Sequence, residues 1–160
     1  MTPPFYSFTE TPVGRLVLAG DCAGLQRIEF CSATDRIRLD QQWEENRAPF
    51  EDAIRQISEY FEGARKTFDL TLVPAGTPFQ QAVWRELLSI PYGTTTSYRD
   101  LARAIGRPSA IRAAGAANGR NPLAIVIPCH RVIGSNGDLT GYGGGLRIKE
   151  TLLALERNNR

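Results

Sequence analysis

The first thirty residues hold three apolar stretches separated by two groups of turn residues, and the last stretch alternates between apolar and polar positions. The apolar stretches are residues 5–8, 16–19 and 25–30, and the interruptions are residues 11–14 and 20–21. Alternation with period two, broken by Pro and Gly, is typical of strands joined by short turns. We therefore expect an antiparallel meander at the start of the chain.

Beyond these strands the pattern changes to that of a helix. Residues 31–48 are polar and irregular, and over residues 49–61 the apolar positions fall at helical spacing. Residues 68–72 alternate again and are expected to form a last strand of this half. Residues 74–76, Pro-Ala-Gly, predict a hinge, so we divide the chain into subdomains 1–74 and 77–160.

From residue 77 the apolar positions keep the spacing of helices. Thr77 and Gln80 frame Pro78 in the arrangement that caps the start of a helix, and Pro91 ends this helix. A last helix follows the glycine-rich loop 141–145. The second half is therefore expected to be mostly helical, and the whole chain to have an α+β fold.

Between these elements lie two shorter helices around a glycine-containing turn. Ser97 is expected to cap the first helix, residues 106–108 form the turn, and Ser109 is expected to cap the second helix. This arrangement is typical of a helix-turn-helix. The second helix, residues 110–118, is rich in alanine and glycine, and Arg112 is its one long exposed candidate for base contact.

A helix of this composition lacks the long polar side chains that read base edges in the major groove. Its thinness suits the minor groove, which is about 6 Å wide, and Arg112 can enter the duplex or fill a vacated position. The alternative is a helix that packs against a neighbour through its alanines and keeps Arg112 at the surface.

One short segment of the second half is the strongest candidate for chemistry. The apolar run 123–127 leads to Pro128, Cys129 and His130, the one histidine of the chain. We expect the run to be a buried strand ended by Pro128, which places Cys129 at the edge of a core. A thiol with a base in reach can become a thiolate nucleophile. Taken alone, a cysteine is more often a core residue.

Charge is unevenly distributed along the chain. Residues 1–76 hold 8 Lys/Arg and 12 Asp/Glu, whereas residues 77–160 hold 11 Lys/Arg and 5 Asp/Glu, so the second half is basic. This asymmetry favours an anionic partner such as nucleic acid for the second half. Two solvated surfaces can also differ this much by chance.

Other features exclude some classes of protein. No apolar stretch is long enough to span a bilayer, and the first residues lack the pattern of a secretory signal, so no membrane is expected as a partner. Three widely spaced cysteines, Cys22, Cys31 and Cys129, argue against a disulfide framework and favour a reducing cytoplasm. Cys22 and Cys31 are expected to pack as small hydrophobic residues. Because the chain has one histidine, no four-coordinate zinc site is expected.

Residues 77–156 resemble the catalytic half of the O6-alkylguanine-DNA alkyltransferases. The matching segments are residues 79–84, 90–98, 117–122, 128–131 and 141–146. The first half resembles the family's N-terminal domain more loosely, which implies an antiparallel sheet with helices in a ribonuclease-H-like arrangement. Members of this family move the alkyl group from O6 of guanine, or O4 of thymine, onto their own cysteine, and each molecule acts once.

The resemblance also implies roles for individual residues. Cys129 would accept the alkyl group, His130 would act as its base through a water, and Glu156 would hold the histidine. Tyr98 would help to turn the nucleotide out of the duplex and would protonate the departing guanine. Asn121 would brace the site.

A second group of residues would contact the nucleic acid. Arg112 would take the place of the extruded base, and the residues expected at the DNA are Arg112, Tyr98, Ala113, Gly115 and Ala116. The residues expected around the base pocket are Tyr142, Gly143, Gly144 and Ala124. Some members have proline in place of Ala124 and serine in place of Gly143, which bears on the largest adduct that fits.

The expected partner is double-stranded DNA that contains O6-alkylguanine, bound by a monomer, with cooperative assembly on DNA left open. No cofactor is expected, because the protein is itself the second substrate. One alternative is a non-catalytic relative that binds alkylated DNA, although such relatives have another residue in place of the acceptor cysteine. The other is a hydrolase with a Cys-His pair, which would turn over many times and would need an oxyanion site.

Overall fold

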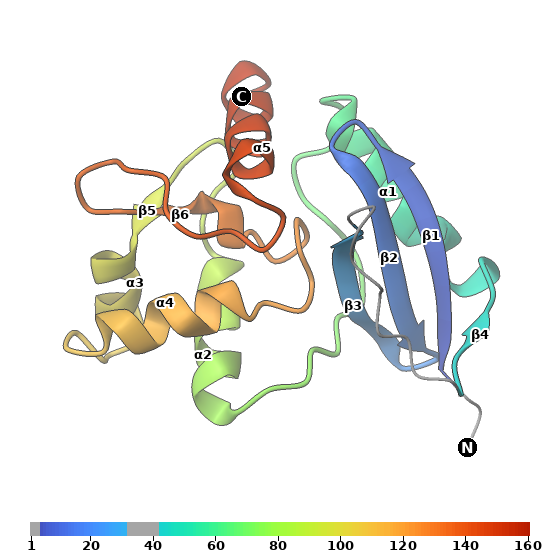
Figure 1. The fold of residues 1–160 in the computed structure, drawn as a ribbon, viewed down its shortest axis with the longest axis horizontal. Coiled ribbons are helices and arrows are strands. Elements are labelled where there is room, and N and C mark those ends of the chain that lie inside the picture. Colours follow the sequence, from blue (N-terminus) through green and yellow to red (C-terminus); the bar gives the residue numbers. More distant parts are fainter. Residues whose placement is uncertain (1–3, 32–41) are drawn as a thin grey trace. The chain divides into compact units, whose positions relative to one another are not determined.

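A computed structural model describes residues 4–31 and 42–160, which fall into two units, Met1–Pro74 and Ala75–Arg160. The first unit holds a sheet with one long helix, and the second is mostly helical (Figure 1), so the predicted α+β fold class is confirmed. Among the described residues, no helix has the length and apolar character needed to cross a membrane.

The first unit is a four-stranded sheet in the order β3-β2-β1-β4. Strands β1 (Phe5–Thr11), β2 (Gly14–Asp21) and β3 (Gly24–Cys31) pair antiparallel, as the alternation predicts. The short strand β4 (Glu44–Glu45) pairs parallel with β1. It lies in the stretch 31–48 that we expected to be irregular, of which residues 32–41 are outside the described part of the chain.

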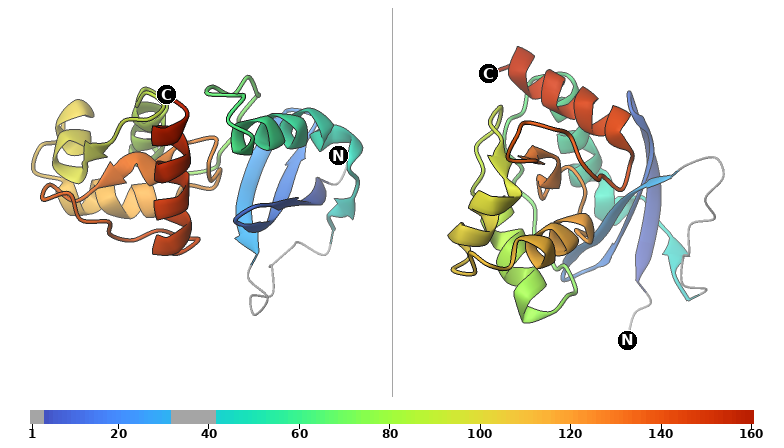
Figure 2. Two further views of the ribbon diagram at one scale, coloured as in Figure 1. Left: turned by 90° about the horizontal axis from the view of Figure 1, so that it is seen from above. Right: turned by 60° about the vertical axis from the view of Figure 1, so that its left-hand side comes forward.

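Helix α1 (Glu51–Phe61) covers one face of this sheet (Figures 1 and 2). It follows the short 3-10 helix Ala48–Phe50 and is amphipathic, as its spacing predicts. The core of the unit consists of apolar side chains from the strands and from α1. These include Leu16, Leu18, Ile28, Ile57 and Tyr60.

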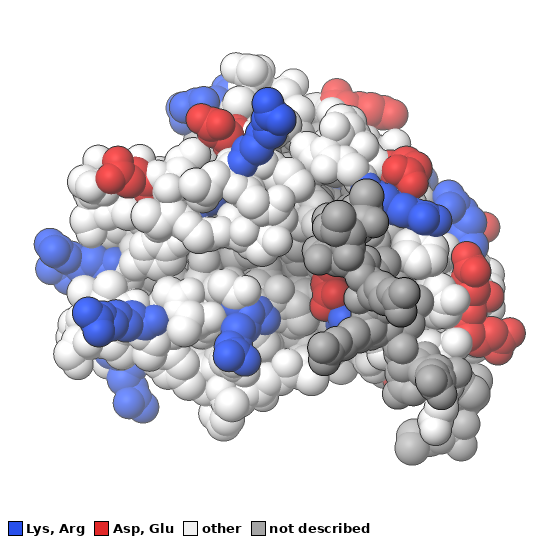
Figure 3. All heavy atoms as spheres, in the orientation of Figure 1, with Lys and Arg blue, Asp and Glu red and all other residues white. Residues whose placement is uncertain are grey.

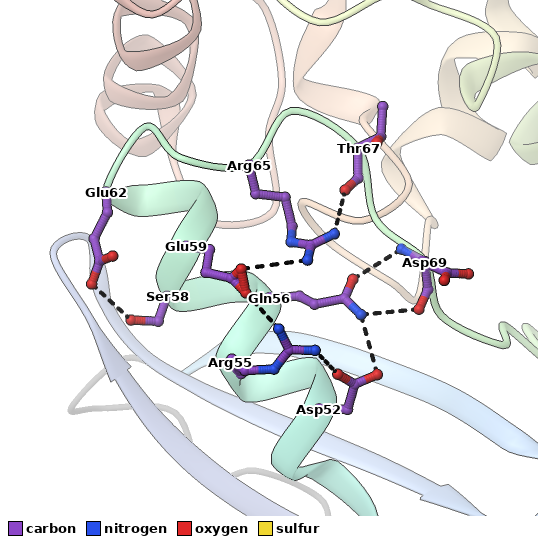
Figure 4. Close-up of polar contacts among 9 residues, drawn as sticks. All are labelled: Asp52, Arg55, Gln56, Ser58, Glu59, Glu62, Arg65, Thr67 and Asp69. Carbon is purple, nitrogen blue, oxygen red and sulfur yellow. Dashed lines mark hydrogen bonds and ion pairs between the residues drawn. The ribbon is translucent and has the colours of Figure 1, made fainter.

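The prediction of a strand over residues 68–72 is wrong. The structure has a single parallel bridge here, between Leu25 and Leu72. The backbone of Asp69 instead meets the side chain of Gln56 (Figure 4). The Gln56 Nε2 donates to the Asp69 carbonyl at 3.0 Å, and the Gln56 Oε1 accepts from the Asp69 amide at 2.9 Å. A buried side-chain amide thus takes the place of a neighbouring strand, which periodicity does not reveal.

The second unit packs short helices around two very short strands. The elements are α2 (Pro78–Leu87), β5 (Thr96–Ser97), α3 (Tyr98–Ala104), α4 (Ile111–Gly119), the 3-10 helix Cys129–Arg131, β6 (Val132–Ile133) and α5 (Leu146–Asn158). Strands β5 and β6 pair parallel, and α2, α3 and α4 pack against one another. The helix-turn-helix is therefore the pair α3 and α4.

Two of the three predicted helix caps in this unit are confirmed. The Thr77 side chain accepts from the Gln80 amide, and Ser97 accepts from the Asp100 amide. The cap at Ser109 is wrong, because α4 begins two residues later and has no side-chain cap. The Ala110 amide donates to the Arg107 carbonyl at 2.9 Å, so residue 109 still belongs to the turn between the helices.

Candidate active site

The segment that leads to Cys129 is buried, but it is not the strand that we expected. The Ile127 amide donates to the Leu123 carbonyl at 2.9 Å, so the run folds into a tight turn. Ile125 has a φ of 72°, in the region that favours glycine. An uninterrupted apolar run indicates burial, but it does not fix the backbone conformation. Strained residues of this kind gather at functional sites.

Cys129 begins the 3-10 helix that follows this turn, and it is 7% exposed. Its amide donates to the Ile127 carbonyl at 2.8 Å, and the Nδ2 of Asn121 donates to the same carbonyl at 2.7 Å. The Nδ2 of Asn118, on α4, donates to the Cys129 carbonyl at 3.4 Å. Two asparagines thus hold the backbone around the thiol.

The environment of the thiol contains opposing influences. Burial raises the pKa of Cys129, whereas a hydrogen bond from the Asn121 side chain and the positive charge of Lys149 lower it. The net effect is a raised pKa, so the resting group is a thiol. A thiol of this kind needs a base to remove its proton before it can act as a nucleophile.

Glu156, on α5, lies at the centre of a buried hydrogen-bond network. Its Oε2 lies 2.6 Å from the Nε2 of His130, and its Oε1 accepts from the Nε of Arg131 at 2.7 Å. The Nη2 of Arg131 donates to Oε2 at 3.1 Å, and the Gly93 amide donates to Oε1 at 3.2 Å. The guanidinium gives the carboxylate a counter-charge, which compensates for its complete burial.

His130 is held by this carboxylate in one tautomer. Because an ionised carboxylate only accepts hydrogen bonds, Nε2 carries the proton and Nδ1 keeps its lone pair. Burial lowers the pKa of His130, and its bond to Glu156 opposes this only in part. Nδ1 has no hydrogen-bond partner among the described residues. The imidazole is therefore a neutral base with its accepting nitrogen available.

Tyr98 and Lys149 share one backbone carbonyl. The Tyr98 hydroxyl donates to the Thr140 carbonyl at 3.1 Å, and the Lys149 Nζ donates to the same oxygen at 2.8 Å. The Lys149 Nζ also donates to the Val132 carbonyl at 2.6 Å and lies 5.9 Å from the centre of the Tyr98 ring. The lysine thus connects the start of α3 with the segment that follows Cys129.

The residues of α4 that we expected at DNA share its outer face. Arg112, Ala113 and Ala116 are exposed, and Gly115 is half-buried. A Cβ added at Gly115 would lie 3.4 Å from the Tyr98 ring, so the glycine brings helix and ring close together. Figure 3 shows Lys and Arg side chains over the part of this unit where α3 and α4 lie. The structure brings this set together, while its contact with DNA stays a prediction.

The residues expected around the base pocket come from two segments. Ala124 lies in the buried turn before Cys129, whereas Gly143 and Gly144 lie in the loop before α5 and are more exposed. Burial, followed by the charges of Cys129 and Glu156, places the pKa of Tyr142 well above its usual range. Tyr142 therefore stays a neutral phenol near the thiol. The pocket itself stays a prediction.

The other two cysteines, Cys22 and Cys31, lie in the first unit. Cys22 is exposed, so the prediction that it packs as a small hydrophobic residue is wrong, and Cys31 is half-buried. Cys22 sits in the β2–β3 turn, where a short connection gives the side chain no core to enter. In the part of the chain that the structure describes, no three His, Cys, Asp or Glu side chains gather as a metal site.

Sequence reasoning did not single out Lys149 and gave Arg131 no role in the site. Both side chains are buried; Arg131 bonds Glu156 directly, and the charge of Lys149 lowers the pKa of Cys129. A signal was present in the last helix, because Lys149, Leu152 and Glu156 recur at helical spacing on the inward face. Two charged residues on a buried stripe indicate a polar site rather than a plain core.

Comparison of the sequence with protein-family profiles assigns both units to the same family. The profile described as "6-O-methylguanine DNA methyltransferase, ribonuclease-like domain" matches residues 5–74, and the profile described as "6-O-methylguanine DNA methyltransferase, DNA binding domain" matches residues 78–158. The chain belongs to the 6-O-methylguanine DNA methyltransferase family. The resemblance drawn from residues 77–156 is thereby confirmed, and the second unit carries the DNA-binding domain of this family.

Individual relatives cover nearly the whole chain. A methylated-DNA–protein-cysteine methyltransferase of Methanosarcina barkeri is 52% identical over 155 residues, which are 97% of this chain and 98% of the relative. One of Mycolicibacterium paratuberculosis is 49% identical over 96% of this chain and 93% of the relative. The crystal structure of Mycobacterium tuberculosis OGT in complex with DNA has a TM-score of 0.89, with 46% identity and coverage of 97% and 94%. The chain therefore shares the fold of these relatives over nearly all of their length.

Proposed function

We propose that this chain is a DNA repair protein that moves the alkyl group of O6-alkylguanine in duplex DNA onto its own Cys129. The observation that carries the proposal is the buried thiol next to a histidine whose Nε2 lies 2.6 Å from Glu156. The names of the relatives, methylated-DNA–protein-cysteine methyltransferase, support the same chemistry. O4-alkylthymine is a second substrate of the same class.

The transfer begins with the removal of the Cys129 proton. Nδ1 of His130 takes this proton through a bridging water, and Glu156 stabilises the imidazolium that forms. Asn121 and Lys149 stabilise the thiolate, since both lower the pKa of Cys129. His130 thus acts as the general base for a thiol that burial would otherwise keep protonated.

The thiolate then attacks the alkyl carbon. The S–C bond forms, the C–O6 bond breaks, and its electron pair goes to the guanine. Tyr98 donates a proton to the departing guanine and is reprotonated from the imidazolium through solvent, so the alkyl group replaces the thiol proton overall. The thioether is stable, and each molecule therefore acts once without a cofactor.

The target base must leave the duplex before this reaction. A base in the stack hides O6, and a damaged pair is turned out at lower cost than an intact one. The thin outer face of α4 suits close approach in the minor groove, and Arg112 fills the space that the base vacates. Because this face has one long side chain, binding tolerates any sequence around the lesion.

One protomer contains every residue that this mechanism uses, so we propose that the protein acts as a monomer. The three free cysteines suit a reducing compartment such as the cytoplasm, where Cys129 stays a thiol. The acceptor cysteine that a non-catalytic lesion-binding protein would lack is present. A hydrolase with a Cys-His pair is the other outcome that an experiment must separate.

Intact-protein mass spectrometry after incubation with a duplex that carries one O6-methylguanine tests the proposal. We expect a gain of about one methylene mass, confined to the Cys129 peptide and saturating at one per molecule. Cys129→Ser is the control and should gain nothing. Lesion-selective binding without a mass gain would favour a damage-binding protein instead. Release of product beyond one per molecule would favour a hydrolase.

A further inference from the structure

Asn118 is a polar residue on the inner face of α4, next to the small apolar residues Ala114 and Ala117. It is 3% exposed, and its Nδ2 donates to the Cys129 carbonyl at 3.4 Å. Its Oδ1 has no hydrogen-bond partner among the described residues. The chemistry proposed above does not use this side chain.

Stability alone does not explain an asparagine at this position. A buried acceptor without a partner costs free energy, whereas an apolar side chain of the same size would fill the space without that cost. The Cys129 carbonyl is not left unsatisfied without Asn118, since it also accepts from the Val132 amide. The amide of Asn118 therefore adds a second link, from α4 to the residue that carries the thiol.

We propose that Asn118 is a positioning residue that fixes the distance between the DNA-facing helix and the thiol. The outer face of α4 presents Arg112 and Ala116, and its inner face holds the backbone of Cys129 through Asn118. When a base is turned out of a duplex bound to α4, the link thus fixes the distance between that base and the Cys129 sulfur. Transfer requires reacting atoms about 3–3.5 Å apart, so a small shift slows it. This inference rests on the proposed function.

Asn118→Leu removes the link and the unpartnered acceptor and keeps the number and branching of the side-chain heavy atoms. Trp84→Phe is the matched control, because the Nε1 of Trp84 donates to the carbonyl of Ala117, one residue earlier on the same helix, and not to Cys129. Single-turnover transfer is measured for both variants with saturating O6-methylguanine duplex and with the free base O6-methylguanine, which carries the same methyl group but no duplex to bind α4. Thermal unfolding and the pH profile of Cys129 alkylation by iodoacetamide complete the set.

We expect Asn118→Leu to slow transfer from the duplex about tenfold and transfer from the free base less than about twofold. Its melting temperature should stay the same or rise, and its iodoacetamide pH profile should not move. Trp84→Phe should melt earlier and react with the duplex at the wild-type rate. An unchanged duplex rate in Asn118→Leu, or equal losses with both substrates, would overturn the inference. Wild-type protein that gains no alkyl group would instead overturn the proposed function.

Discussion

Lys149 and Glu156 lie two turns apart on α5, and both charged side chains are completely buried on the face that meets the Cys129 segment. Lys149 acts on the thiol, whose pKa its charge lowers, while Glu156 holds His130. One helix thus supplies the cation for the nucleophile and the anion for the base. The charge of Lys149 also lowers the pKa of His130, so the same cation helps to keep the imidazole neutral while it offsets part of the effect of burial on the thiol.

Lys149→Met should slow the reactions of Cys129 at neutral pH. The change keeps an unbranched side chain, one atom shorter, but removes the charge that lowers the pKa of the thiol, so a smaller fraction of Cys129 is thiolate at any given pH. We expect iodoacetamide alkylation at neutral pH to slow several-fold, with its pH profile moved to higher pH. Arg147→Met, which removes an exposed charge from the same helix, is the control and should leave the profile in place.

His130 should make stability fall on mild acidification. Its folded pKa is lowered from 6.5, so below pH 6.5 the unfolded chain takes up a proton that the folded protein does not. This stability is fully present above pH 6.5 and is lost as the pH falls through the folded pKa, by at most about 1.4 kcal/mol per pH unit. Urea unfolding between pH 5 and 8 measures this slope.

The assignment is simple because the chain has no other histidine. In His130→Asn, the dependence of the free energy of unfolding on pH should become weaker between pH 5.5 and 6.5. The dependence that remains arises from the titration of carboxylates. A wild-type protein that is equally stable across this range would contradict a lowered folded pKa.

Arg131→Met should destabilise the fold, since it leaves the buried Glu156 carboxylate without its counter-charge. Removing one partner of a buried ion pair costs about 3–5 kcal/mol, and here three N–H donors are lost, two to Glu156 and one to the Ile90 carbonyl. In the double variant Arg131→Met/Glu156→Gln the charge is gone as well. We expect its urea midpoint to lie above that of the single variant, and additive losses would contradict the pairing.

The sequence alone reveals those functional residues that stand out from their neighbours along the chain. Cys129 and His130 are adjacent, and Arg112 stands alone in a run of small residues, so both stood out without a structure. Asn118 and Lys149 contact the Cys129 segment from other helices, across 11 residues for the bond from Asn118. Contacts of this kind depend on tertiary packing, which no local spacing encodes.

Backbone conformation was predicted least well where apolar residues are continuous. The run 123–127 has the composition of a buried strand, yet it folds into a turn with Ile125 at positive φ. A segment that is buried on all sides lacks the alternation of apolar and polar residues by which a strand can be told from a turn. The same limit applies to residues 68–72, where Gln56 bonds the backbone in place of a strand.

Arg112→Ala should weaken the binding of duplex DNA and slow repair while leaving the thiol as reactive as before. Arg112 is exposed on α4 and has no contact with Cys129, so iodoacetamide should alkylate both proteins at one rate. If the guanidinium fills the space of the extruded base, transfer at saturating duplex should fall at least about tenfold, because the flipped state loses its support. Arg157→Ala, an exposed arginine on α5, is the control for loss of charge alone. Equal transfer rates for Arg112→Ala and Arg157→Ala at saturating duplex would rule out the intercalating role, even if both bound DNA more weakly.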